Sequence, residues 1–176
     1  IAGAGAPDIA GGVAVWTGSE VIVWGVHYEP YGTSPSGRAA RYDPANDDWR
    51  PVSEVGMPSP RGNPSFVWTG SEAILWGGWL HDALDTGGRY DPRSDSWTPT
   101  SVQDVPYKRQ NHSAFWTGRE MLVWGGEAHD AVFATGGLYD PASNSWRPTS
   151  NGHTPTGRFS HTSIWTGEMM IVWGGI

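Results

Sequence analysis

Residues 116–126 read WTGREMLVWGG, and close copies of this stretch start at Trp16, Trp68 and Trp165. Each copy has a Trp-Thr-Gly at the end of one apolar run and continues into a second apolar run that closes on Trp-Gly. Tryptophan and β-branched residues favour the pleated surface of a strand, whereas Thr-Gly interrupts it. The stretch therefore predicts two β-strands joined by a tight turn, and the chain contains four such pairs.

Fixed intervals connect these copies to two further landmarks, a Tyr-Asp-Pro and a third tryptophan. The first tryptophans are 52, 48 and 49 residues apart. The second tryptophan follows the first after 8 residues, the third follows the tyrosine after 7, and the next unit begins 19 residues later. Only the interval from the second tryptophan to the tyrosine varies, being 18, 14 and 15 residues. Constant spacing is typical of packed structure, so the variable interval indicates a surface loop.

Each unit is predicted to form four antiparallel strands. The second strand, such as residues 73–76 (AILW), is continuously apolar, so both of its faces should be buried. Tyr-Asp-Pro followed by polar residues predicts a turn between the third and fourth strands. A four-stranded meander of this size cannot bury both faces alone, and the units are therefore expected to stack face to face around an axis.

These landmarks resemble the kelch repeat, which has Gly-Gly after an apolar strand, a downstream Tyr-Asp, a Trp six or seven residues later and an Arg before the next unit. The Trp-Thr-Gly-x-Glu variant is similar to kelch-like repeats of bacterial exported proteins and of the galactose oxidase central domain. The resemblance implies an all-β fold, a β-propeller with one four-stranded antiparallel blade per repeat. It covers residues 1–176 as a single segment of about three and a half blades, at approximately 9–52, 61–100, 109–149 and 158–176 (units 1 to 4).

The fourth unit stops after its second strand, at Ile176. Residues 169–173 (MMIVW) would then form an unpaired apolar edge, which is the kind of edge that recruits another chain. Two explanations are open. Either the rest of a propeller of about six to eight blades lies outside this sequence, or neighbouring chains complete the blade.

Composition excludes several classes of function. The net charge of −7 argues against nucleic acid and anionic membranes as partners. No apolar run reaches the 18 residues of a membrane-spanning helix, so no membrane insertion is expected. The chain has no cysteine, and the copper oxidases of the kelch family need a cysteine-modified tyrosine, so no cofactor is expected. By resemblance we expect the protein to be secreted, in the extracellular space or the periplasm.

The candidate site residues lie near the variable loops. In a meander, the connection between strands two and three and the connection to the next unit share one face. Because the family places its first strand innermost, the resemblance implies that Arg61, Arg109 and Arg158 stand near the channel mouth. There they could bind carboxylates or sulfates. The alternative is that each arginine bonds backbone carbonyls or an acid of a neighbouring blade.

Other candidates come from the loops themselves. His81-Asp82 and His129-Asp130 both begin five residues after the second tryptophan of their units, but the three or four ligands of a metal site are not evident. They are either ligands or solvated loop residues. Trp79 is the one tryptophan off the repeating pattern and is our candidate for stacking on a sugar, whereas the other eleven are expected in the core between blades.

Two histidines and a set of glutamates complete the candidates. His112 and His161 stand at matching places in their units and are interpreted either as acids or bases facing the channel or as hydrogen-bonded structural residues. Pairing or capping within the Trp-Thr-Gly turn, at the opposite face, explains Glu20, Glu72, Glu120 and Glu168.

Three functions are open. The leading hypothesis is a non-catalytic binding or scaffold protein that makes protein or glycan contacts through its variable loops, because the chain has no phosphate loop and no nucleophile elbow. The second is a self-assembling protein whose incomplete blade is completed by a neighbouring chain in a ring or filament. The third is a carbohydrate-active enzyme for acidic sugars, in which the arginines grip a carboxylate and His112 or His161 moves protons.

Overall fold

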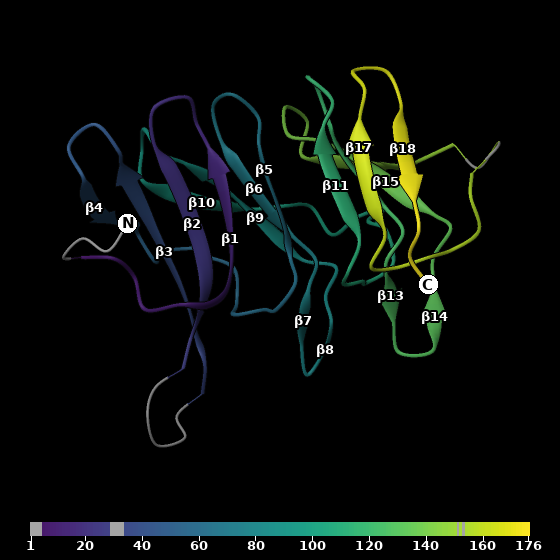
Figure 1. Ribbon diagram of the computed structural model, residues 1–176, viewed down its shortest axis with the longest axis horizontal. Coiled ribbons are helices and arrows are strands. Elements are labelled where there is room, and N and C mark those ends of the chain that lie inside the picture. The colour runs from purple at the N-terminus through teal and green to yellow at the C-terminus, as the bar shows by residue number, and fades with distance from the viewer. Residues whose placement is uncertain (1–4, 29–33, 151, 153) are drawn as a thin grey trace.

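The computed structural model describes residues 5–28, 34–150, 152 and 154–176, and these residues contain strands, turns and loops without any helix (Figure 1). No element of this part could cross a membrane as a helix. The strands of units 1 to 3 form one four-stranded antiparallel sheet each. Unit 1 contains β1 (Ala10–Trp16), β2 (Val21–His27), β3 (Ser36–Asp43) and β4 (Asp48–Pro51). Unit 2 contains β5 (Ser65–Trp68), β6 (Ala73–Trp76), β9 (Gly87–Asp91) and β10 (Ser96–Pro99). Unit 3 contains β11 (Ser113–Trp116), β12 (Met121–Trp124), β15 (Gly136–Asp140) and β16 (Ser145–Pro148).

The remaining strands form two-stranded sheets. In unit 4, β17 (Thr162–Trp165) pairs with β18 (Met170–Trp173). The variable loops of units 2 and 3 fold into short hairpins, β7 (Trp79–Leu80) with β8 (Asp82–Ala83) and β13 (Glu127–Ala128) with β14 (Ala131–Val132). The sheets stand side by side in an arc, and the first strands meet along its inner side, where β5 contacts both β1 and β11, and β11 contacts β17 (Figure 1). This is the arrangement expected of kelch propeller blades.

The core lies between neighbouring sheets and is built from their second strands. All four residues of β6 are buried, as the continuous apolar pattern predicts. The second tryptophans Trp24, Trp76 and Trp124 are 0%, 0% and 4% exposed. One cluster joins units 1 and 2 and a second joins units 2 and 3. Each sheet therefore needs its neighbour to bury its apolar face.

The expectation that eleven tryptophans lie in the core is wrong for the first-strand position. Trp16 is 53% exposed, and Trp68 and Trp116 are only partly buried. Trp68 and Trp116 lie at the end of an inner strand, where the preceding unit offers a turn instead of a sheet face. Trp16 ends the first strand of unit 1, and no described sheet stands before that strand to cover it. The second-strand tryptophan of unit 4, Trp173, is 81% exposed.

Side chains within the turns explain the recurring Thr and Asp. The hydroxyl of Thr117 accepts the amide proton of Glu120 at 3.0 Å and donates to its carbonyl at 3.0 Å. In unit 4 the corresponding partner is Met169, so Glu168 stands one place earlier and is not equivalent to the other turn glutamates. Asp140 accepts the amide proton of Ala142, as expected for an aspartate that begins a turn.

The third tryptophan and the tyrosine tie each unit to the linker before it. Trp97 Nε1 donates to the carbonyl of Ser53 at 3.1 Å. The hydroxyl of Tyr90 donates to Asp95 at 2.7 Å, and the same carboxylate accepts the amide proton of Ser53 at 3.0 Å. These bonds cross from one unit to the next, which accounts for the two constant intervals of the sequence.

Candidate functional site

The variable loops and the linkers between units lie on one face, which we call the loop face (lower side of Figure 1). The hairpin β7–β8 is attached to the linker through a bridge between Trp79 and Gly62, and β13 is attached in the same way through Glu127 and Gln110. The meander topology predicted this arrangement. On this face any ligand would meet side chains from both kinds of connection.

Arg61 and Arg109 are buried residues, 2% and 1% exposed. Their guanidinium groups bind backbone carbonyls. Arg61 donates to the carbonyls of Gly77 and Thr86 at 3.2 and 2.6 Å. Arg109 makes the matching bonds to Gly125 and Thr135 at 2.8 and 2.7 Å. Burial lowers the pKa of both side chains to about 10.

Phe133 covers the guanidinium of Arg109, with 4.5 Å between Cζ and the ring centroid. Arg158 repeats the pattern in unit 4 through the carbonyls of Thr156 and Gly174, in a more exposed setting. These bonds join the end of each linker to the second strand of its own unit. They match the alternative of backbone bonding, and we place these arginines in the framework that supports the loop face.

His112 and His161 pack against the second tryptophan of the preceding unit. The two rings meet Trp76 and Trp124 edge-on, at centroid distances of 5.3 and 5.4 Å. Burial, with the nearby charge of Arg109 next in size, lowers the pKa of His112 to about 3. Burial also lowers the pKa of His161. Both imidazoles are therefore held in the neutral form at neutral pH.

The two histidines differ in their hydrogen bonds. His161 Nε2 lies 2.9 Å from the hydroxyl of Ser113, which in turn accepts a bond from Ser163 at 2.6 Å. Both ring nitrogens of His112 are buried without a hydrogen-bond partner in the described part of the chain. Its ring instead fills the space above Gly77, where a Cβ atom would approach Cε1 to 2.7 Å. The geometry favours a packing role for His112.

A cluster of four side chains from two units forms the best-defined feature of the loop face. We call Trp79, Asp82, Lys108 and His129 the loop-face cluster. Asp82 is its centre, because one carboxylate oxygen lies 2.8 Å from His129 Nε2 and the other is bonded to Lys108 Nζ. The hydrogen bond from Lys108 is the main cause that lowers the pKa of Asp82. The ring of His129 stands edge-on to Trp79, with 5.9 Å between centroids.

The cluster reassigns the two His-Asp pairs of the sequence. Asp82 pairs with a histidine of the next hairpin instead of with its neighbour, while His81 and Asp130 lie exposed outside the cluster. Sequence reasoning missed Lys108, although it stands where the other linkers have Pro60 and Gly157. Within the described residues, no group of three or more His, Asp or Glu is placed to hold a metal ion.

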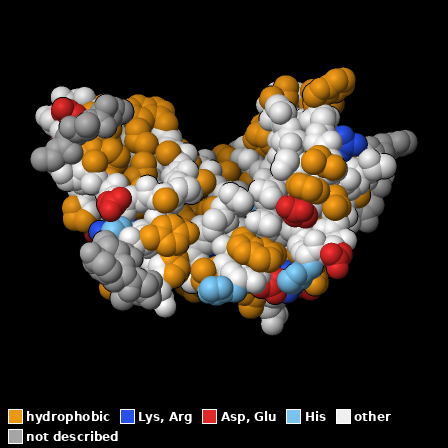
Figure 2. All heavy atoms as spheres, turned by 60° about the horizontal axis from the view of Figure 1, so that its bottom comes forward, with side chains coloured by type: hydrophobic (Ala, Val, Ile, Leu, Met, Phe, Trp, Pro, Cys, Tyr) orange, Lys and Arg blue, Asp and Glu red, His pale blue; other side chains and the backbone are white. Residues whose placement is uncertain are grey.

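Figure 2 turns the loop face toward the viewer and shows apolar, histidine and acidic side chains gathered on it. Near the loop-face cluster, Tyr107 is 59% exposed and Val132 46%. Tyr107 packs at a tilt against Phe133, with 5.6 Å between ring centroids, so the exposed ring is held in place. This face combines anchored aromatic rings with a small polar network.

Comparison with known proteins bears on the whole chain. No curated protein matches it. The family model described as the KLHDC2/KLHL20/DRC7 Kelch-repeats domain matches residues 11–176. That match spans nearly the full chain and agrees with the four-stranded sheets, so the chain belongs to the kelch-repeat family.

Proposed function

We propose that this chain is a non-catalytic binding module that engages a protein partner through the loop-face cluster. Kelch repeats generally mediate protein–protein interactions, which is consistent with a binding or scaffold role. The observation that carries the proposal is the position of Asp82. Its carboxylate binds Lys108 of the following linker and His129 of the next hairpin. These contacts fix Trp79 and its surroundings before any partner arrives.

Such fixed geometry favours binding, because less side-chain freedom is lost when the complex forms. Trp and Tyr are the residues that most often dominate an interface. Trp79 and Tyr107 supply the aromatic anchors here, and Asp82 with Lys108 supplies a polar rim whose charges cancel. The surface therefore suits a partner segment with an apolar side chain at its centre.

The sequence also raises expectations that go beyond protein binding. A location outside the cytoplasm, glycan contacts through the loops and self-association remain predictions. The acidic-sugar enzyme needs arginines that face the channel and histidines that carry protons at neutral pH. Arg61 and Arg109 are instead buried against backbone carbonyls, and His112 is held neutral.

Selection of peptides tests the proposal. The chain would be immobilised and used to select binders from a random peptide library on phage, and the affinity of each peptide would be measured by calorimetry. We expect Trp79→Ala to weaken binding about 10- to 30-fold, as for a hot-spot residue, and Asp82→Asn to weaken it less.

The control is Ser94→Ala, which alters an exposed turn residue on the opposite face and should leave the affinity unchanged. Peptides that bind Trp79→Ala as tightly as the unmodified chain would contradict the proposal. Failure to select any peptide would contradict it as well.

A further inference from the structure

The face opposite the loops, which we call the turn face, has two grooves at equivalent places in successive units. Groove A lies between units 2 and 3 and groove B between units 1 and 2, with volumes of about 370 and 250 Å³. In each groove the Trp-Thr-Gly turn of one unit faces the first tryptophan of the next unit. The Tyr-Asp-Pro turn of that next unit closes the remaining side. Groove A is comparable in size with the smaller known ligand pockets, at about 300 Å³ and above.

The indole of Trp116 is the apolar wall of groove A. It packs with part of its surface on the core cluster between units 2 and 3, and the rest lines the groove. Trp68 has the same position in groove B. An indole fixed on one side and open on the other is a surface on which the C–H face of a sugar ring can stack.

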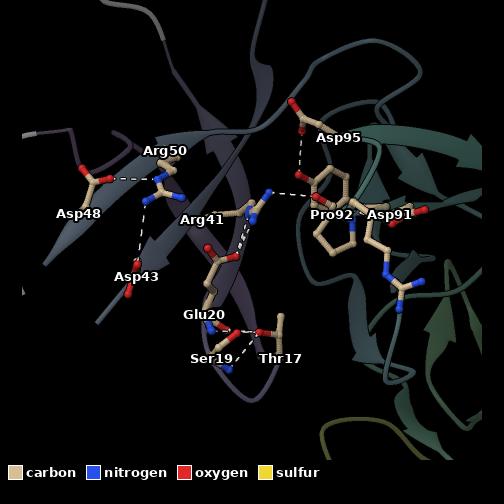
Figure 3. A network of polar contacts seen from close by, with 12 residues as sticks. Thr17, Ser19, Glu20, Arg41, Asp43, Asp48, Arg50, Asp91, Pro92 and Asp95 are labelled. Atoms are coloured by element: carbon tan, nitrogen blue, oxygen red, sulfur yellow. Dashed lines mark hydrogen bonds and ion pairs between the residues drawn. The ribbon is translucent and has the colours of Figure 1, made fainter. Parts of the chain in front are cut away.

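The two grooves differ in how their turn glutamate is bound. In groove B, Glu20 Oε2 accepts a hydrogen bond from Arg41 Nε at 2.8 Å and lies 2.7 Å from Arg41 Nη2 in an ion pair. Figure 3 shows this closed pair, with Arg41 also donating to the carbonyl of Pro92 at 3.1 Å. One oxygen of the Glu20 carboxylate is thus bound by an arginine of its own unit.

In groove A the corresponding pair, Glu72 and Arg89, is open, meaning that no hydrogen bond joins the two side chains. Glu72 lies 3.7 Å from Arg89 Nε, beyond hydrogen-bond distance, and this Nε is buried without a hydrogen-bond partner among the described residues. Arg89 Nη1 instead donates a hydrogen bond of 2.6 Å to the carbonyl of Pro141. A buried donor left without its bond costs about 1–3 kcal/mol. The carboxylate of Glu72 therefore keeps acceptor positions for a group that enters the groove.

The charges around groove A select the class of ligand. Glu72 and Asp140 supply two negative charges, and Arg89 and Arg119 supply two positive ones. Asp140 uses one oxygen within its turn, and its other oxygen is 3.9 Å from Arg119. Balanced charges do not favour an anion or a cation, but carboxylates and guanidinium groups bind hydroxyl groups well.

From this arrangement we infer that groove A binds a neutral sugar residue of an oligosaccharide. The ring stacks on Trp116, and its hydroxyl groups donate to Glu72 and Asp140. The inference is independent of the protein partner proposed for the loop face, since the two faces share no cluster residue. Because groove B lies one unit away, a longer glycan could contact both grooves and would then bind with a higher overall affinity.

Saturation-transfer difference NMR tests this inference with cellohexaose, mannohexaose and xylohexaose as neutral probes and hexagalacturonic acid as the anionic probe. At least one neutral hexasaccharide should receive saturation, with a Kd on the order of millimolar for one small subsite. Glu72→Gln and Asp140→Asn should each weaken that binding about 10-fold, the effect of a lost bond to a charged group.

Two controls identify the site. Glu120→Gln changes the same turn position one unit later, outside both grooves, and should leave binding unchanged. Trp79→Ala, on the loop face, should also leave it unchanged. The indole signal of Trp116, assigned through Trp116→Phe, should shift on titration, and dispersed indole signals in each variant would show that it is folded.

Three results would overturn the inference. The first is the absence of saturation for every neutral hexasaccharide at millimolar concentration. The second is binding that survives in both Glu72→Gln and Asp140→Asn. The third is binding of hexagalacturonic acid alone, which would mean that the groove selects charge.

Discussion

Replacing Arg109 with methionine should destabilise the chain strongly, whereas the same change at Arg158 should have little effect. Arg109 is 1% exposed and donates to the carbonyls of Tyr107, Gly125 and Thr135 at 2.9, 2.8 and 2.7 Å. Methionine has a similar length and apolar stem but no donor. The substitution therefore removes three bonds and leaves their carbonyls in a place that water reaches poorly.

The magnitude follows from two opposing contributions. A hydrogen bond to a charged group contributes about 1.5–3 kcal/mol, so three give about 4.5–9 kcal/mol. Burial of the guanidinium opposes this. Its pKa falls from 12.5 to about 10, which at about 1.36 kcal/mol per pKa unit is a cost of about 3 kcal/mol. The free energy of unfolding should thus fall by about 1–6 kcal/mol in Arg109→Met.

Urea unfolding followed by tryptophan fluorescence measures this difference. With a slope of about 2 kcal/mol per molar urea, Arg109→Met should lower the midpoint by about 0.5–3 M. Arg158 makes three comparable bonds in an exposed setting, so Arg158→Met should change the free energy by only about 0.5 kcal/mol. Equal effects of the two substitutions, or an Arg109→Met midpoint within error of the parent, would refute the structural role assigned to this buried guanidinium.

Three further predictions concern the packing between units. Since burial lowers the pKa of His112 from 6.5 to about 3, the unfolded chain binds the extra proton between these pH values, and stability is lost as the pH falls below about 6.5. From pH 7 to 5 this loss should be about 2 kcal/mol, and urea titrations should show it reduced in His112→Phe; an unchanged pH dependence would contradict the assignment. Gly77→Ala should lower the melting temperature more than Gly118→Ala, because both glycines have positive φ but only the first Cβ meets a neighbour, at 2.7 Å. The excess should be about 1–3 kcal/mol, and calorimetry that ranks the two variants in the opposite order would count against the packing. Tyr90→Phe removes the bond to Asp95 and should cost about 1 kcal/mol, measured by urea midpoint; no loss would mean that the backbone bond to the carboxylate suffices alone.

The fold could be predicted from the sequence because its repeating bonds are local or lie at fixed separations. The constant interval of 7 residues reflects a tyrosine and a tryptophan that face each other across a hairpin, as Tyr90 and Trp97 do. The linker of constant length reflects the bond from that tryptophan to Ser53 in the preceding unit. Because the units repeat, each of these constraints appears in the sequence as a constant interval.

The site was less predictable, because its geometry depends on contacts between units. The sequence presents His81-Asp82 and His129-Asp130 as two neighbouring pairs, yet the structure joins Asp82 to His129 across two hairpins. Adjacent residues at a hairpin tip point in different directions, so sequence neighbours need not be contacts.

Burial was also misjudged where a repeated residue lies at the edge of its layer. Trp16 and Trp76 are both repeating tryptophans, but Trp16 ends the first strand of unit 1, where no described sheet covers it, and is 53% exposed. Trp76 lies between two sheets and is 0% exposed. A repeating position shows that a residue has the same place within each unit. It does not show that a neighbouring unit covers it.

The turn glutamate shows how one repeated position can serve structure in two units and remain open in another. Glu120 of unit 3 has no arginine on the adjacent strand, because Leu138 stands there, and it is held instead by Arg147 of the outer strand at 3.0 and 2.7 Å. Unit 3 therefore restores by a different route the closed pair that unit 1 forms directly.

Unit 2 has the arginine in the usual place, but Thr98 opposite it offers no second cation, and Arg89 is bonded to the carbonyl of Pro141 in the next unit. Of the three turn glutamates, Glu72 is thus the one whose nearest guanidinium, Arg89 at 3.7 Å, lies beyond hydrogen-bond distance in the described structure. Because Glu72 also faces the larger of the two grooves, the open carboxylate and the space for a ligand occur in the same place. Closing the pair from the outer strand, with Thr98→Arg, should therefore reproduce the arrangement of unit 3 and abolish sugar binding without removing any residue of groove A. Sugar binding that persists in Thr98→Arg with a closed pair, seen as a shifted carboxylate carbon signal of Glu72 by NMR, would show that the open carboxylate is not what recognises the ligand.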